Sequence, residues 1–211
     1  MRREPHVRFC ERAGVGFPRA THLIAGFEYE ADARRFLDAM RARFAGFALS
    51  FHPGKTRLIE FGRHAAANRR TRGLGKPETF DFLGFTHICG KSRRGGFLLT
   101  RKSRRDRIRA KLQAINEELR KRMHQPIPEQ GQWLRQVVAG FFNYHAVPTN
   151  SRALAAFRYH VTVSWLRALR RRSQRHRLSW DRMTKLVADI LPRPAILHPW
   201  PNVRFAVNHP R

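Results

Sequence analysis

In the stretch SRRDRIRAKLQAINEELRK at residues 103–121, the sequence pattern changes from strand-like to helical, and this change divides the chain into two parts. Four apolar residues recur in it at steps of four, three and four, the spacing of one face of an α-helix: Ile108, Leu112, Ile115 and Leu119. The basic residues of the stretch lie largely off this face. The pattern therefore predicts an amphipathic helix, and we place a boundary between two parts of the chain near Lys102.

Three further helices are expected downstream. The first carries the apolar residues from Trp133 to Phe142 and stops at Pro148, after Pro126 and Pro128 have ended the preceding helix. The second can be capped by Asn150 or Ser151, and it carries Leu154, Phe157, Val161, Trp165 and Leu169. The third can be capped by Ser179 and is closed by Pro192, after which a proline-rich, extended tail is expected.

Upstream of residue 103 the pattern mixes helix and strand. A helix is expected from Glu30, because Phe36, Leu37, Met40, Phe44 and Phe47 recur at helical spacing. A β-hairpin should follow, with strands at 47–51 and 56–61, and then a polar, basic loop at 62–78. A second hairpin should run from the aromatic stretch at 80–88 through a turn at 90–96 to a strand at 97–100. Residues 1–22 show no period and give no prediction. The helix and the two hairpins upstream, together with the helices downstream, predict a fold that is α+β to about residue 102 and all-helical beyond it.

Charge is the strongest compositional signal. The 211 residues include 43 lysines and arginines but only 15 aspartates and glutamates, giving a net charge of +28. Such an excess points to a polyanionic partner, most simply a nucleic acid. Arginine suits RNA in particular, because its planar guanidinium binds phosphates and stacks on bases.

Several classes of protein and site are excluded. Two cysteines, Cys10 and Cys89, cannot build a disulfide scaffold, and no CxxC pair supports a zinc ribbon or finger. No apolar run reaches the roughly 18 residues of a membrane span, and the N-terminus lacks the apolar stretch of a signal peptide. We therefore expect a soluble protein of the cytoplasm.

The sequence offers no catalytic centre. Nucleotidyl transfer by two metals needs at least two converging carboxylates, and the chain has no Asp-Asp pair. Glu117 and Glu118 are adjacent, but adjacent side chains diverge on a helix. We expect no catalytic residue, no metal site and no cofactor in this chain.

A binding surface is better supported. Between Asp81 and Asp106 the chain carries seven cations and no acid, and few acids accompany the other basic clusters. Tyr144 and Tyr159 could stack on bases, whereas the spacing of Trp133 and Trp165 favours core packing. The clusters expected to contact phosphates are Arg69/Arg70/Arg72, then Arg93/Arg94 with Arg101/Lys102/Arg104/Arg105, then Arg170/Arg171/Arg172/Arg175/Arg177.

Three blocks resemble one family. They are FHPGKTRLIEFG at 51–62, FDFLGFT at 80–86 and GFFNYHAVP at 140–148. In this order they resemble the end of the palm, the primer-grip block and the maturase-specific thumb, or domain X, of group II intron reverse transcriptase/maturases. The resemblance runs from about Gly26 to the end of the chain.

The resemblance implies a domain organisation and a partner. It makes residues 26–102 a palm remnant and 103–192 a helical thumb, with an unassigned segment at 1–25 and a tail at 193–211. In the family, the thumb and domain X bind the host intron RNA and help it fold and splice. Leu83, Gly84 and Phe85 would shape the primer grip, and Lys55 would lie near the palm active site. With the basic clusters, the residues expected to contact RNA are Lys55, Arg57, Arg69, Arg70, Arg72, Arg93, Arg94, Arg101, Lys102, Arg104, Arg105, Arg109, Lys111, Arg170, Arg171, Arg172 and Arg175.

The chain departs from the family at the catalytic block. Where the family's Tyr-Ala-Asp-Asp motif should stand, this sequence has Arg19-Ala20-Thr21-His22. Autonomous DNA synthesis is therefore not expected, and a truncated or frame-shifted gene copy is one expected origin. Three alternatives to an intron-RNA-binding fragment stay open. They are half of a split polymerase whose partner chain supplies the fingers and palm with their Mg²⁺ ligands, a non-functional remnant, and a general nucleic-acid-coating protein.

Overall fold

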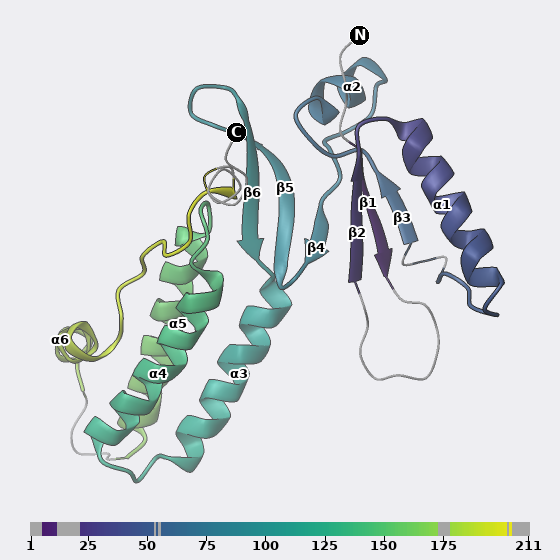
Figure 1. The fold of residues 1–211 in the computed structure, drawn as a ribbon. Coiled ribbons are helices and arrows are strands. Elements are labelled where there is room, and N and C mark those ends of the chain that lie inside the picture. The colour runs from purple at the N-terminus through teal and green to yellow at the C-terminus, as the bar shows by residue number, and fades with distance from the viewer. Residues whose placement is uncertain are drawn as a thin grey trace. The chain divides into compact units, whose positions relative to one another are not determined.

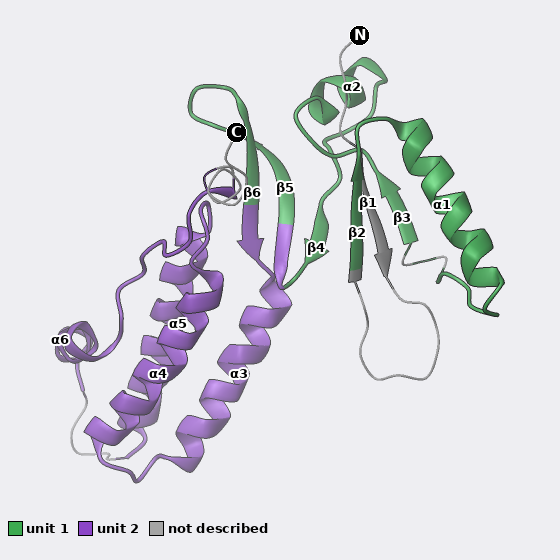
Figure 2. Ribbon diagram, viewed as in Figure 1, with its two compact units in different colours: residues 1–83, 87–100 green, residues 84–86, 101–211 purple. Residues whose placement is uncertain are grey.

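The structure is a computed structural model that describes residues 6–11, 22–52, 54, 56–172, 178–201 and 203. Over these residues the chain forms six helices and six strands, so the fold is α+β (Figure 1). The chain divides into two compact units, shown in Figure 2. The first unit comprises residues 1–83 and 87–100, and the second comprises residues 84–86 and 101–211.

The first unit contains a three-stranded antiparallel sheet. Its strands are β1 (His6–Glu11), β2 (His22–Phe27) and β3 (Thr56–Ile59), in the order β2-β1-β3. Residue 7 of β1 pairs with Gly26 on one side and with Ile59 on the other. The predicted hairpin of 47–51 with 56–61 is therefore wrong: β3 pairs with β1, and Phe51 forms only an isolated bridge. Strand β1 also occupies a segment in which no periodicity was expected.

Helix α1 (Glu30–Ala45) begins where the sequence predicts and packs on β1 and β2. Ala33 is fully buried, and the Phe36 ring lies 5.1 Å from that of Phe27. The helix ends before Phe47, which is 66% exposed and so does not belong to the buried face.

Helix α2 (Ala65–Thr71) replaces part of the predicted loop at 62–78. Its sequence, AAANRRT, contains no large apolar residue and therefore shows no apolar period, and Ala65 is its buried residue. A short alanine-rich segment can still be helical, since alanine has the highest intrinsic helix propensity.

The second sheet has the order β4-β5-β6, with β4 (Phe80–Phe82), β5 (Phe85–Lys91) and β6 (Phe97–Ser103). The predicted hairpin around residues 90–96 is confirmed. The aromatic stretch at 80–88 is not one strand, however, because Leu83 and Gly84 have φ values of 46° and 78° and form a turn inside it. Two successive residues with positive φ are typical of a type I′ hairpin turn. Within the first unit, Phe80 and Phe82 pack with Ile59 and Phe61.

The second unit is helical, as predicted. It contains α3 (Arg105–Lys121), α4 (Ile127–His145), α5 (Ser151–Arg170) and α6 (Trp180–Ile190). Helix α4 starts before Trp133, with Pro128 in its first turn. Proline is tolerated there because the backbone N–H groups of the first turn have no partner within the helix. The apolar faces of the four helices meet in one core, whose members include Leu119, Leu134, Phe157, Trp165 and Met183.

A buried glutamine ties three of these helices together. Gln130 on α4 accepts a 2.9 Å hydrogen bond from Nε1 of Trp165, and its Nε2 donates to the carbonyl of Arg122 at 2.8 Å. Arg158 on α5 donates to the carbonyls of Val187 and Pro192, each at 3.1 Å, and so satisfies the end of α6. Burial lowers the pKa of Arg158, and this cation therefore has a structural role.

The predicted side-chain cap is present in α6 but not at Asn150 of α5. The Oγ of Ser179 accepts from the backbone N–H of Arg182 at 3.3 Å and caps α6 as expected. Asn150 occupies the N-cap position of α5 but does not cap it with its side chain. Its amide nitrogen instead donates to Ser103 Oγ and to the carbonyl of His145, both at 2.8 Å.

Within the described ranges, none of the helices combines the length and apolar character that a membrane crossing requires.

Candidate nucleic-acid interface

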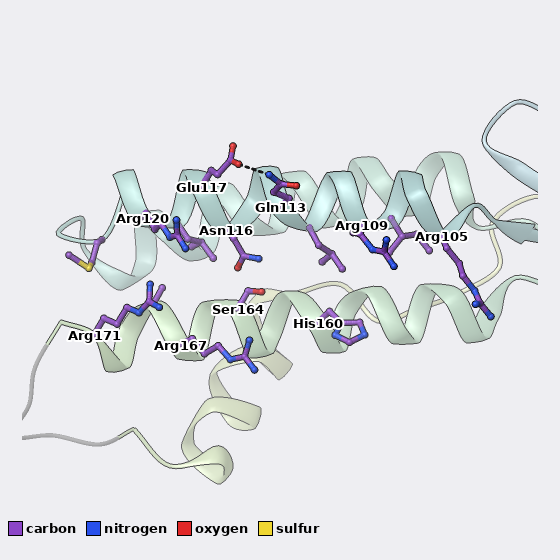
Figure 3. A pocket seen from close by; sticks show the side chains of 15 residues that line it. Arg105, Arg109, Gln113, Asn116, Glu117, Arg120, His160, Ser164, Arg167 and Arg171 are labelled. Atoms are coloured by element: carbon purple, nitrogen blue, oxygen red, sulfur yellow. Dashed lines mark hydrogen bonds between the residues drawn. The ribbon is translucent and has the colours of Figure 1, made fainter.

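A groove of about 690 Å³ runs between α3 and α5 of the second unit (Figure 3). Its apolar lining comes from Ile108, Leu112, Leu119 and Met123 on the α3 side and Ala168 on α5. Ile108 and Leu112 belong to the stripe that the sequence predicts, and they pack against the core while remaining partly exposed. The groove is therefore the outer margin of the contact between these two helices.

Arginines dominate the polar lining of this groove. Helix α3 contributes Arg105, Arg109 and Arg120, and the α5 side contributes Arg167 and Arg171 (Figure 3). We call these five residues the groove arginines. His160 and Ser164 also line the α5 side.

Among the residues that the structure describes, no carboxylate neutralises the groove arginines. None of the five forms an ion pair within the part of the chain that the structure describes. The acid of the lining, Glu117, accepts a 3.1 Å hydrogen bond from Gln113, and both side chains point away from the space between the helices in Figure 3. Asn116 points into that space. The groove is therefore strongly electropositive.

Helical spacing explains how these residues gather. On α5, the polar residues at 160, 164, 167 and 171 are separated by four, three and four positions, so they share one face. The apolar residues Phe157, Val161 and Trp165 lie on the buried face of the same helix. From Arg105 to Arg120 the cations extend over about 22 Å of α3, at about 1.5 Å per residue.

Such a groove can hold a sugar-phosphate backbone. Each guanidinium can donate two parallel hydrogen bonds to a phosphate, and these bonds are stronger than those between neutral groups. The Asn116 amide and the Ser164 hydroxyl add uncharged donors and acceptors that suit ribose hydroxyls.

No protein-family model matches this chain, and no curated protein matches it.

Three of the residues predicted to contact RNA lie in the groove: Arg105, Arg109 and Arg171. Sequence reasoning left out Arg120, Arg167 and His160, none of which belongs to the three clusters that it singled out. Helical spacing could have identified two of them: His160 and Arg167 lie seven residues apart, and Arg167 lies four residues before Arg171, so all three share one helix face.

The first basic cluster is largely neutralised, so the expected lack of compensating acids is wrong there. Arg72 forms an ion pair with Glu60, and Arg57, which lies outside the cluster but was also predicted to contact RNA, forms one with Glu78. Arg69 also lies 3.9 Å from Glu78 and donates to the carbonyl of Gly75. Only Arg70 of this cluster is exposed without an ion pair among the described residues.

The second cluster is divided between exposed and engaged cations. Arg93, Arg94 and Lys102 are exposed around the β5–β6 hairpin. Arg101 is half-buried, and burial lowers its pKa. Arg104 forms a 2.6 Å ion pair with Asp106 and holds the pKa of that carboxyl below its usual value.

The remaining predicted residues lie outside the groove. Lys111, Arg170 and Arg172 are exposed, and Arg170 donates to the carbonyl of Leu178 at 2.9 Å. Lys55 and Arg175, with Arg177 of the third cluster, lie outside the described residues.

The three residues predicted to shape a primer grip lie at the β4–β5 turn. Leu83 is exposed and Gly84 occupies the second turn position. Phe85 is buried, and its ring stacks on Tyr144 at 5.7 Å. The turn therefore presents the apolar side chain of Leu83, and no charge of its own, to solvent.

Across the described residues, no three His, Cys, Asp or Glu side chains come together as metal ligands.

Proposed function

We propose that this chain binds structured RNA and that the α3–α5 groove holds the RNA backbone. The observation that carries the proposal is the presence of five groove arginines with no carboxylate partner among the described residues. Unpaired guanidinium groups repel one another, and a phosphate backbone relieves that repulsion. The net charge of +28 supports the same conclusion, because it provides long-range attraction to any polyanion.

We propose further that the chain is the C-terminal part of a group II intron reverse transcriptase/maturase, with intron RNA as its ligand. The order of a mixed α+β unit and a helical unit supports this origin, since it is the order of palm and thumb in that family. On this proposal the chain contributes RNA binding, and polymerisation would need another chain to supply the catalytic carboxylates.

Affinity for RNA is expected to fall steeply with salt, because each phosphate contact releases counterions. With about five contacts, the slope of log affinity against log salt should be about −3.5, at about −0.7 per contact on single strands. Fluorescence anisotropy with a labelled, structured transcript measures this slope from low to physiological salt. A nearly flat plot would exclude electrostatic binding.

The intron assignment has its own test. A transcript containing a group II intron domain should bind more tightly than an unrelated folded transcript of equal length at physiological salt. Equal affinities, combined with a steep salt slope, would leave a general RNA-binding protein and remove the maturase assignment.

A further inference from the structure

An exposed pair of aromatic rings adjoins the groove. Tyr159 on α5 and Trp180 at the start of α6 have ring centroids 5.8 Å apart, inclined at 60°. They are 55% and 39% exposed. The Tyr159 ring also lies 5.5 Å from that of His160, which lines the groove. We call Tyr159 and Trp180 the aromatic platform.

The platform is not explained by the packing of the second unit. The core of this unit is built from other faces of α5 and α6, through residues such as Val161, Trp165, Met183 and Val187. Neither the Tyr159 hydroxyl nor the Trp180 indole N–H makes a hydrogen bond within the described residues. Two large rings thus remain in contact with water beside a row of cations.

We propose that the aromatic platform stacks an unpaired nucleobase of the strand whose phosphates occupy the groove. This inference rests on the proposed function and names its substrate class, which is single-stranded nucleic acid or an unpaired loop of a folded RNA. Sequence-tolerant single-strand binding combines a cationic groove for the backbone with aromatic rings for the bases, and both are present here. A base inside a duplex has no free face for a ring, so the platform adds nothing to duplex binding.

The test uses the full chain with three ligands: a uridine oligoribonucleotide, the matching single-stranded DNA and a blunt RNA duplex with the same number of phosphates. Tyr159→Ala and Trp180→Ala should each weaken single-strand binding at least about fivefold, because each removes a ring on which one base can stack. Duplex affinity should not change. Tyr159→Phe and Trp180→Phe should retain single-strand affinity, because stacking needs the ring and not its polar atom.

Trp200→Ala is the matched control, since Trp200 is also a half-exposed aromatic residue of the second unit but has no aromatic partner among the described residues. It should leave every affinity unchanged. Equal losses on duplex and single strand, an equal loss in Trp200→Ala, or unchanged affinity in Tyr159→Ala would each overturn the inference. If one alanine variant fails to melt cooperatively, the single-strand and duplex affinities of the other alanine variant and of the two phenylalanine variants test the inference in its place.

The two proposals fail differently. A wild-type chain that binds no RNA removes both of them. A wild-type chain with a steep salt slope whose platform variants behave normally removes the aromatic platform alone. Losses on RNA and DNA strands together support recognition of the base, and a loss on RNA alone supports stacking that also depends on the 2′-hydroxyl.

Discussion

Replacing Arg105, Arg109 and Arg167 together with glutamine is expected to weaken RNA binding at least about 100-fold. A hydrogen bond to a charged group contributes about 1.5–3 kcal/mol, so three lost phosphate contacts exceed the roughly 2.8 kcal/mol that 100-fold represents. The salt slope should become shallower by about 2, at about 0.7 per contact. Fluorescence anisotropy at two or more salt concentrations measures both effects.

The matched control removes the same number of charges from α1. Arg34, Arg35 and Arg41 are exposed there, and each is paired with a carboxylate of its own helix: Glu30, Asp32 and Asp38, respectively. Changing these three arginines to glutamine should reduce affinity far less, because they are already neutralised. Equal losses in the two triple variants would mean that net charge, and not the groove, determines binding.

Neither triple variant should unfold the protein. The groove arginines make no ion pair among the described residues, and the apolar residues beneath them are untouched by the substitutions. Thermal melting followed by circular dichroism should therefore give similar midpoints for wild type and for the groove variant. If the midpoint of the groove variant dropped strongly, its loss of affinity could come from unfolding and not from lost phosphate contacts. The three single variants would then be measured instead of the triple variant.

Local periodicity explains why the helical unit could be predicted. The face formed by Ile108, Leu112, Ile115 and Leu119 depends on residues within one helix, and so does the Ser179 cap of α6. Such signals are legible because residues three and four apart are neighbours on a helix whatever the rest of the chain does.

The sheet of the first unit could not be predicted for the opposite reason. Its central strand, β1, pairs with β3, about fifty residues further along the chain. A hairpin of neighbouring segments was expected because residues 47–51 alternate and residues 52–55 have the composition of a turn. The long-range pairing depends on β1, in which polar and apolar residues alternate only over residues 6–9, too short a run to identify a strand.

The sequence singled out residues of the groove only within the basic clusters that it named. Arg105, Arg109 and Arg171 stand in obvious clusters, but Arg167 and His160 became visible only when the face of α5 that adjoins α3 was known. Conversely, Arg72 appeared unpaired in the sequence because its partner, Glu60, lies twelve positions away. Charge counting over short windows therefore both missed and overstated the binding surface.

A buried histidine should make the second unit sensitive to acid. His145 is 8% exposed, and its Nδ1 lies 2.9 Å from Ser103 Oγ, which accepts from Asn150 Nδ2 at 2.8 Å. The Phe141 ring stacks on it at 4.2 Å. Burial lowers the pKa of His145 from its usual 6.5 to about 4, because an apolar surrounding disfavours the charged imidazolium.

The sign of the effect follows from proton binding. In the unfolded chain His145 titrates near pH 6.5, whereas in the folded chain it stays neutral until about pH 4. Between these values the unfolded state binds more protons, so the contribution of His145 lowers the free energy of unfolding as the pH is lowered through this window, and that contribution is constant above it. The full loss is about 3 kcal/mol, at about 1.4 kcal/mol per pKa unit.

Urea denaturation of wild type and His145→Asn between pH 7 and pH 4 measures this contribution. The variant should be less stable at pH 7, because it loses the ring stacking and the bond to Ser103, but its stability should fall less on acidification. His124→Gln is the control, since His124 is exposed and should leave the wild-type pH dependence intact. A His145 variant that loses as much stability in acid as wild type does would show that other groups, and not this imidazole, bind the protons that accompany unfolding.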